Sequence, residues 1–342
     1  MSLKNVELKN RQLIWFSIIA AFMIISVALN ILIGSVPISL SELYQIIMKH
    51  ETASTKGFII WNIRMSRALA AVFGGAFLAV SGLLLQVFFR NPIVGPFILG
   101  ISSGATLMVS FVMLTTATMG FTLLSPFMTT LSAFVGAYGT MLIILSIATR
   151  VKSGITLLIV GLMMGYLCHA VTSVLVAFAE KEKIKGFVLW QLGSFSGFQW
   201  NEIQVMVVVG GIILVLVYGL SKPLNAFLLG EEYASSMGVN IRLFRILILL
   251  CACSLAGMVT AVAGPVAFIG LAVPHMARLC FNTSNNRVLV PGCLLMGGVI
   301  TSLCDFIARM AFTPVELPIS AITAFFGAPI VLSLLLKRKV SI

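Results

Sequence analysis

Long apolar runs, separated by short polar stretches, dominate the sequence. Many of them reach about 18 residues, which is the length that an α-helix needs to cross about 30 Å of hydrocarbon. We predict ten such helices, of which the eighth is short and rich in glycine and proline. Their ranges are near 13–34, 62–84, 97–117, 124–148, 154–178, 202–220, 242–262, 266–277, 289–310 and 317–336.

The composition indicates that the chain is embedded in a lipid bilayer. Of its 342 residues, 60% are hydrophobic and 9% are charged, whereas a soluble domain carries about 25% charged residues. So few charges cannot cover a surface that faces water. We therefore predict an all-α, multi-pass membrane protein that forms a single transmembrane domain over residues 1–342.

The net charge of +12 is explained by orientation in the membrane, so it does not indicate a nucleic-acid partner. With both termini on the inner side, fourteen of the 22 Lys and Arg residues fall inside and eight fall outside. Basic residues of membrane proteins gather on the cytoplasmic side. This bias predicts that both termini are cytoplasmic.

The sequence contains no recognisable catalytic or metal-binding arrangement. The six cysteines lie in or beside apolar segments, and none has CxxC spacing. A Walker-type nucleotide loop is absent, as is a Ser/His/Asp or HExxH arrangement within the apolar segments. We therefore predict that the chain is not an enzyme and holds no cofactor or metal. Energy for any transport has to come from a partner or from an ion gradient.

Several short motifs follow one another along the chain. They are RxxRxxA from Arg64, GAxLAxSG, RNP, ILGISSGA, GEExA, FIGLxxPHxxR, DxxAR, ELPI and GAP. In this order they resemble the FecCD-type permeases, the membrane subunits of bacterial importers for iron-siderophores, haem and vitamin B12. The resemblance covers residues from about 13 to 336.

The resemblance implies a ten-helix permease in the bacterial cytoplasmic membrane. The implied partners are two cytoplasmic ATPase subunits, a second permease that is identical or homologous, and an extracytoplasmic substrate-binding protein. The favoured substrate is an iron-siderophore-type chelate, with haem or vitamin B12 as alternatives. A gradient-driven secondary transporter is less favoured, because Asp305 is the only plausible intramembrane carboxylate for ion coupling.

Three arginines, Arg64, Arg67 and Arg309, fall on the predicted outer side, against the general bias. Arg64 and Arg67 are three residues apart, a spacing that places two side chains on one helix face. The residues alone are equally consistent with arginines that snorkel to lipid headgroups, or with Arg309 paired to Asp305. The resemblance implies that all three receive acidic residues of the docked binding protein, a role that suits bidentate Arg–carboxylate contacts.

The polar stretch GEEYASSMG at 230–238 lies in a predicted cytoplasmic loop from about 221 to 241. Its glutamates favour a helix N-terminus, and by itself the stretch indicates a solvated loop helix. The resemblance implies instead a coupling helix that sits in a groove of the ATPase, where Ala234 and Ser235 offer a small, close-fitting surface. The residues assigned to coupling are Gly230, Glu231, Glu232, Ala234, Ser235 and Gly238.

Two further groups are candidates for the transport path. Asn91, Pro92 and Ile93 follow the second predicted helix, where proline and asparagine predict a tight inner loop or gate. Tyr166 and His169 lie in the fifth predicted helix, and a polar residue at membrane depth is a candidate for function. A hydrogen bond from His169 to a neighbouring helix and a contact between His169 and the substrate or haem iron both remain open.

Overall fold

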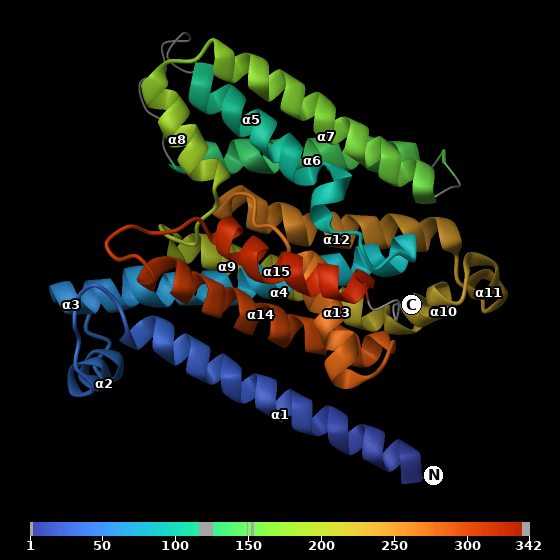
Figure 1. Ribbon diagram of the computed structural model, residues 1–342, viewed down its shortest axis with the longest axis horizontal. Helices are drawn as coiled ribbons and strands as arrows, with labels where there is room; N and C mark the ends of the chain where they lie inside the picture. Colours follow the sequence, from blue (N-terminus) through green and yellow to red (C-terminus); the bar gives the residue numbers. More distant parts are fainter. Residues whose placement is uncertain (1–2, 116–125, 149, 152–153, 337–342) are drawn as a thin grey trace.

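The computed structural model describes residues 3–115, 126–148, 150–151 and 154–336, and every regular element in these ranges is a helix (Figure 1). Seven stretches are long and apolar enough to cross a membrane, and three shorter helices are apolar. Each predicted segment overlaps one of them, although residues 116–117 and 124–125 lie outside the described ranges. The ten are α1 (Leu3–Leu32), α3 (Thr55–Phe58) with η1 (Ile59–Met65) and α4 (Ser66–Phe89), α5 (Ile101–Thr115), α6 (Pro126–Ala148), α7 (Gly154–Ala177), α9 (Trp200–Gly219), α12 (Ile241–Ala263), α13 (Ile269–Phe281), α14 (Asn286–Met310) and α15 (Ile319–Leu336).

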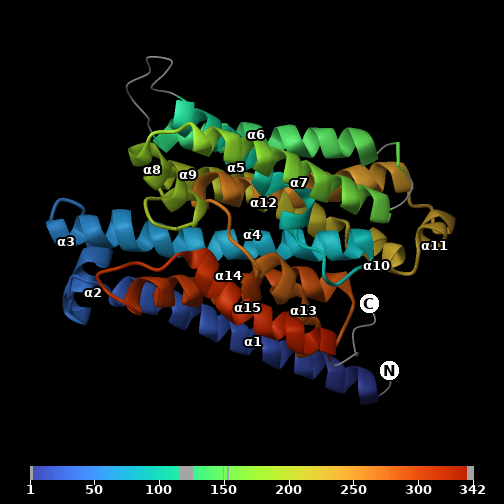
Figure 2. The same cartoon turned by 45° about the horizontal axis from the view of Figure 1, so that its top comes forward.

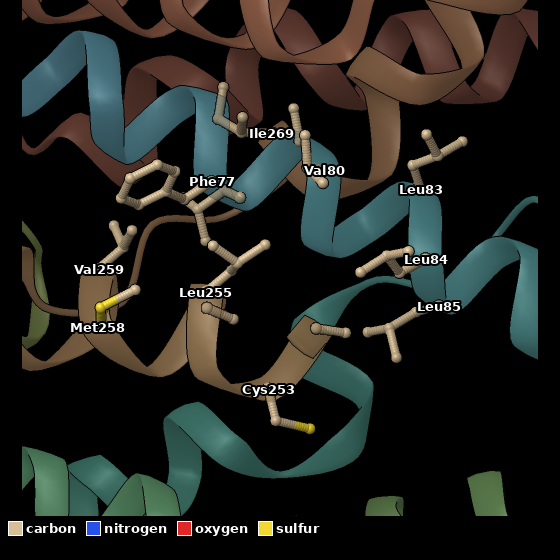
Figure 3. Close-up of a cluster of buried hydrophobic side chains, with 14 of the residues drawn as sticks. Phe77, Val80, Leu83, Leu84, Leu85, Cys253, Leu255, Met258, Val259 and Ile269 are labelled. Atoms are coloured by element: carbon tan, nitrogen blue, oxygen red, sulfur yellow. The ribbon is translucent and has the colours of Figure 1, made fainter. Parts of the chain in front are cut away.

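Helix α4 lies at the centre of the bundle and packs against α12, α13 and α14 (Figures 1 and 2). Most of its residues are buried, as expected for a helix that is apolar on all sides. Phe77 and Leu84 of α4 belong to the same buried cluster as Val259 of α12 (Figure 3). The other elements are arranged around this helix.

Glycines set the distance between α4 and two of its neighbours. A Cβ atom added at Gly82 would lie 1.7 Å from the carbonyl oxygen of Gly270 in α13. A Cβ atom added at Gly75 would lie 2.3 Å from the carbonyl oxygen of Gly297 in α14. Lipid is as apolar as the side chains, so helices in a bilayer associate largely through such close packing.

Helices α5, α6 and α7 form a second group beside this centre (Figure 1). In the most apolar part of α7 only 17% of the residues are buried, against 83% for the stretch that contains α4. A helix that is apolar all round and so little buried leaves a face that lipid or another protein must cover. Helix α7 is therefore the outermost of the seven long stretches.

Short helices occupy the two ends of the bundle. Helices α2 (Leu40–Met48) and α3 lie at one end, and α10 (Ser221–Leu228) and α11 (Glu231–Ser236) lie at the other (Figure 1). Helix α1 begins and α15 ends on the side of α10 and α11 (Figures 1 and 2). The sequence analysis missed α2, α8 (Lys181–Gln191) and α10, because they are too short to span a membrane.

The substitution Gly82→Ala should destabilise the protein strongly. The new methyl group would overlap the backbone of Gly270 and force α4 and α13 apart, and overpacking of this kind costs about 1–3 kcal/mol or more. The melting temperature of the purified protein in detergent measures this loss of stability, with size-exclusion chromatography used to monitor thermal unfolding.

Gly211→Ala is the matched control, because no atom lies within 4 Å of a Cβ atom added at Gly211 in α9. Alanine is favoured over glycine within a helix by about 0.5–1 kcal/mol, so this variant should be as stable as the parent protein. Equal melting temperatures for the two variants would contradict the packing described for α4 and α13.

Candidate docking, coupling and pathway sites

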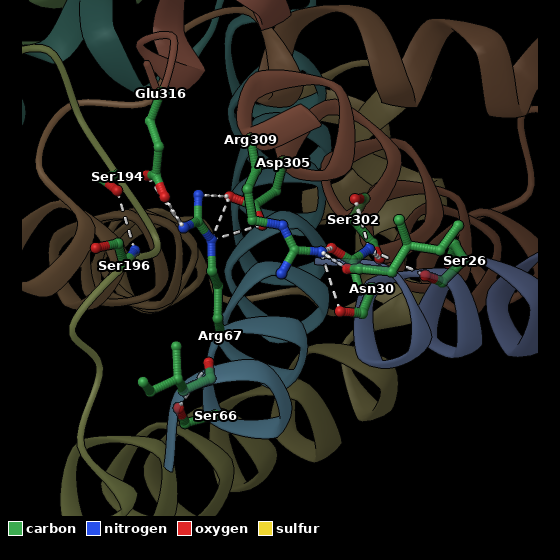
Figure 4. Close-up of polar contacts among 12 residues, drawn as sticks. Ser26, Asn30, Ser66, Arg67, Ser194, Ser196, Ser302, Asp305, Arg309 and Glu316 are labelled. Atoms are coloured by element: carbon green, nitrogen blue, oxygen red, sulfur yellow. Dashed lines mark hydrogen bonds and ion pairs between the residues drawn. The ribbon is translucent and has the colours of Figure 1, made fainter. Parts of the chain in front are cut away.

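The three arginines predicted to dock a binding protein line one cavity with Val36 and Ile59, near the start of α2 and the end of α3. Figure 4 shows two of them, Arg67 and Arg309. The cavity lined by Arg64, Arg67 and Arg309 has a volume of about 270 Å³. The contact between α4 and α14 brings Arg309 to the other two. The cluster is therefore a product of helix packing.

Arg67 is buried, and its guanidinium group is shared between two carboxylates (Figure 4). Its Nε lies 2.9 Å from Oδ2 of Asp305, and its Nη2 lies 3.0 Å from Oδ1. Its Nη1 donates to Glu316, in the connection between α14 and α15, at 2.9 Å. The Asp305 side chain is fully buried, whereas 48% of the Glu316 side chain is exposed. Arg67 thus ties α4 to α14 by a bidentate pair, the geometry of the strongest Arg–carboxylate contacts.

Arg64 holds the end of α1. Its Nη1 donates to the carbonyl oxygens of Ile31, at 2.9 Å, and Leu32, at 3.0 Å, and its Nη2 donates to the carbonyl of Val36. The last carbonyls of a helix have no donor within the helix, and their partial negative charge attracts a cation. Arg64 therefore caps α1.

Arg309 completes this cap. Its Nη2 donates to the carbonyl oxygens of Asn30 and Ile33, both at 3.0 Å (Figure 4). The pairing of Arg309 with Asp305 that the spacing allows is not observed among the described residues, where the hydrogen bonds to Asp305 come from Arg67. The Nε of Arg309 is buried and has no partner in the described part of the chain.

Arg64 and Arg67 line the same cavity, as a shared helix face would allow, but they contact different helices. Arg64 lies in η1, which is a π-helix, whereas Arg67 lies in the α-helix that follows. The wider π turn changes the angular spacing of side chains. Arg64 consequently reaches α1, while Arg67 reaches α14.

The cavity carries an excess positive charge. Three guanidinium groups line it, and only the carboxylates of Asp305 and Glu316 oppose them. A buried N–H without an acceptor also costs free energy, and the Nε of Arg309 is in this state. The described side chains thus leave the cavity with one unbalanced positive charge.

A second ion pair attaches α2 near this cavity. The Nζ of Lys56 lies 2.6 Å from Oε1 of Glu42, and Ser39 at the N-cap of α2 adds hydrogen bonds to the same carboxylate. Together they lower the pKa of Glu42 to about 2, with the bond from Lys56 as the largest cause. A lowered pKa stabilises the folded state above the ordinary pKa of the group, and this contribution is lost as the pH falls towards 2. Glu42 is therefore ionised at neutral pH.

The stretch predicted to couple to an ATPase forms two short helices, α10 and α11, at the opposite end of the bundle (Figure 1). They meet at Gly230, whose φ is +123°, a conformation that glycine adopts without steric cost. Gly238, with φ of +83°, follows α11 before α12 begins. The two glycines allow the chain to turn sharply before and after α11.

The surface of α11 differs from the prediction. Ser235 is exposed as predicted, but Ala234 is fully buried against its own chain, so it does not contribute to an outward face. The large apolar residues that face outward are Tyr233, 47% exposed, and Met237, 65% exposed, with the exposed Leu229 just before them. The i, i+4 spacing of Tyr233 and Met237 in a polar loop was the sequence signal that could have identified them.

Glu231 of α11 faces the protein, whereas Glu232 is exposed. The two carboxylate oxygens of Glu231 lie 2.6 and 2.7 Å from Nη2 of Arg245 in α12. Nη1 of Arg245 also donates to the carbonyl of Val151, at 3.4 Å, just before α7. One guanidinium group therefore connects α11, α12 and the approach to α7.

The turn at Asn91, Pro92 and Ile93 follows α4 at the same end as α11. Oδ1 of Asn91 accepts a hydrogen bond from the backbone N–H of Ile93 at 3.0 Å, which forms the tight Asx-turn expected of asparagine. Ile93 is exposed and lines a cavity of about 260 Å³ beside Phe97. A gating role for the turn stays a prediction.

Tyr166 and His169 are both exposed on α7, but the structure separates them. His169 lines a cavity of about 300 Å³ formed by η2 (Pro96–Leu99), α5, α7, α8, α15 and the connection after α12, and Tyr166 is not among the described residues that line it. The polar residues that line the cavity with His169 are Ser102, Ser103, Thr106, Thr172, Gln191 and Ser320.

A bundle of apolar helices with an arginine-lined cavity at one end and an exposed pair of short helices at the other fits a membrane permease subunit. The model of the FecCD transport family matches residues 22–337. The vitamin B12 import system permease protein BtuC of Salmonella typhi is 35% identical over 316 residues, which cover 92% of this chain and 94% of that protein. BtuC of Citrobacter koseri is 33% identical over 333 residues, covering 97% and 96%. The chain belongs to the FecCD transport family.

Solved structures agree with this assignment. An ABC transporter assigned to the metal-chelate type, in an inward-facing conformation, matches with a TM-score of 0.82 and 28% identity, covering 95% of this chain and 99% of that one. The PsaBC structure from Streptococcus pneumoniae in complex with Fab shares the fold, with a TM-score of 0.51, 15% identity, and coverage of 86% and 95%. This chain is therefore a multi-pass permease subunit of an ABC importer, and ATP hydrolysis belongs to separate subunits.

The substitution Asp305→Ala should lower the free energy of unfolding by about 3–5 kcal/mol, because it leaves the Arg67 charge buried without its main partner. Glu316→Ala should cost at most about 1 kcal/mol, since exposed ion pairs contribute little. Denaturation in mixed micelles measures both values.

The double variant Arg67→Met, Asp305→Leu is the control, because it removes both charges and should recover most of the stability that Asp305→Ala loses. If Glu316→Ala proved as destabilising as Asp305→Ala, then Asp305 would not be the main stabilising partner of Arg67.

Proposed function

We propose that this chain is the permease of a metal-chelate importer in the bacterial cytoplasmic membrane. The observation that carries the proposal is the family match over residues 22–337, together with the two functional ends of the bundle. The relatives named BtuC favour vitamin B12 as one candidate substrate, and the solved metal-chelate transporter is consistent with an iron-siderophore-type chelate as the other. Haem is a third candidate. Coupling to an ion gradient is disfavoured, because Asp305 is already engaged by Arg67.

We also propose ten membrane crossings within one domain over residues 1–342, with both termini in the cytoplasm. The seven long stretches and three shorter apolar helices support the count. The start of α1 and the end of α15 lie on the side of α10 and α11 (Figure 2), and the excess of basic residues favours the cytoplasm for that side. The arginine cavity then opens outside.

The arginine cavity is proposed to receive one carboxylate of the extracytoplasmic binding protein. Its excess positive charge supports this role. Reversing the charges of Arg64 and Arg67 would be a poor test, because both side chains also hold the fold together. Thr313, which is exposed and lines the cavity, is a better position.

The substitution Thr313→Asp should weaken binding of the binding protein by about tenfold or more, because a like charge at an interface costs several kcal/mol. The new carboxylate would occupy the cavity in place of the incoming one. Surface plasmon resonance with the permease in nanodiscs measures the affinity.

Thr313→Asn is the matched control, since it has the same shape as the aspartate variant without the charge. It should bind the binding protein as the parent does. A similar loss of affinity in both variants would point to shape alone and would argue against a carboxylate site.

The other end is proposed to dock the ATPase. Helix α11, with Tyr233 and Met237 on its outer face, fits a helix that inserts into a groove of one ATPase subunit. A pair of permeases would engage two such subunits. The exposed apolar face of α7 supports a second permease beside it, identical or homologous.

Proteoliposomes that contain the importer should take up radiolabelled ferrichrome or cyanocobalamin only with ATP on the side of α11. The double substitution Tyr233→Ala, Met237→Ala should lower both ATPase binding and uptake by about tenfold or more, because large apolar and aromatic anchors dominate interface energies. Pull-down of the ATPase and uptake assays measure the two effects.

Helix α2 offers the matched control. Tyr44 and Met48 have the same spacing and similar exposure at the opposite end of the bundle, so Tyr44→Ala, Met48→Ala should leave ATPase binding unchanged. Uptake that proceeds without ATP and follows an ion gradient would refute the importer.

A further inference from the structure

The polar residues that line the cavity beside His169 take no part in the proposed docking of the binding protein or of the ATPase. Its lining includes five hydroxyl-bearing residues, the amide of Gln191 and the imidazole of His169. Polar side chains at membrane depth are costly and mark functional positions. The elements that enclose the cavity come from distant parts of the chain, so the polar lining is assembled by the fold.

Thr172 is the residue that indicates a missing partner. It is 4% exposed, and its Oγ1 is buried without a hydrogen-bond partner in the described part of the chain. A buried hydroxyl left unsatisfied costs about 1–3 kcal/mol. Ser173, the next residue, instead donates to the carbonyl oxygen of His169 in its own helix at 2.9 Å. Thr172 also lines the cavity, so a molecule bound there is the partner that we infer for this hydroxyl.

The charge of the cavity limits what that molecule is. No Asp, Glu, Lys or Arg is present among the described residues that line it. An anionic group would have to leave water without finding a counter-charge, which is strongly unfavourable. Amide groups carry no charge and both accept and donate hydrogen bonds, and the oxygens of metal-bound hydroxamates accept them, which matches hydroxyl, amide and imidazole side chains.

We propose that this cavity is a binding subsite for the amide-bearing or hydroxamate-bearing periphery of an uncharged metal chelate, and that it disfavours anionic chelates such as haem. This rests on the proposed function as a chelate importer. The chemistry is shared by neutral ferric tris-hydroxamates and by amide-bearing corrinoids. A volume of about 300 Å³ is at the lower limit of ligand pockets, so the cavity takes one arm of the chelate. His169 then serves as a hydrogen-bonding group.

Direct binding to the purified permease in lipid nanodiscs tests the proposal. The probes are ferrichrome, cyanocobalamin and haemin, each followed by quenching of tryptophan fluorescence, since Trp190 adjoins Gln191 at the cavity. Ferrichrome or cyanocobalamin should bind about tenfold more tightly than haemin, and comparison of these two probes identifies the kind of chelate. Thr172→Val and Gln191→Leu should each weaken binding of the uncharged probe by about threefold to tenfold, the equivalent of one hydrogen bond.

Two controls separate binding from folding. Ser173→Ala removes a hydroxyl on the same helix that does not line the cavity among the described residues, and it should leave affinity unchanged. Thr172→Val should not lower the melting temperature, because the hydroxyl that it removes has no partner in the described protein. A lower melting temperature with unchanged affinity would assign Thr172 a purely structural role and overturn the proposal.

The subsite is also overturned if neither uncharged probe binds, if haemin binds more tightly, or if Thr172→Val and Gln191→Leu bind normally. These results leave the importer itself intact as long as uptake of any chelate into proteoliposomes requires ATP. Uptake without ATP would instead refute the proposed function, whatever the nanodisc measurements give.

Discussion

Within a bilayer no water is available to satisfy a polar group, and most of this structure follows from that constraint. Even at the end of the bundle that carries α2 and α3, the last carbonyls of α1 are satisfied by protein groups, since Arg64 and Arg309 reach them from two other parts of the chain. Each arginine brings a charge that must in turn be compensated. The result is one network that joins α1, α4 and α14 at a single end of the bundle.

The same constraint explains the close packing around α4. Helices that cannot gain much from the hydrophobic effect must gain from contact, and contact at backbone distance requires glycine. Gly75 and Gly82 allow α14 and α13 to approach α4 on its two sides. This packing holds Arg67 where Asp305 can reach it. The glycines and the ion pair therefore depend on each other.

The arginine cluster has a structural role in this fold, and the docking role proposed for it would be added to that one. Arg67 is committed to Asp305 and shares its remaining N–H groups with the exposed Glu316. Arg309 caps α1 with Nη2 and keeps its Nε unpartnered. The side chains of the proposed docking site are thus held in place by contacts that also stabilise the fold.

The positions of the apolar helices could be predicted because apolar length is a local property of the sequence. The partner of Asp305 could not, since the spacing within one helix favours Arg309 whereas the non-local contact between α4 and α14 provides Arg67. The burial of Ala234 could not be predicted either, because it too depends on tertiary contacts. The cavity beside His169 draws its residues from five parts of the chain, and no local pattern predicts such a site.

The cavity beside His169 and the glycine contacts of α4 share no residue. Helix α7, which contributes His169 and Thr172, is the least buried of the long stretches. Substitutions that reshape the cavity therefore leave the central packing untouched. With the subsite proposed above, a few substitutions at the periphery would be enough to change the chelate that is carried, while the scaffold around α4 stays the same.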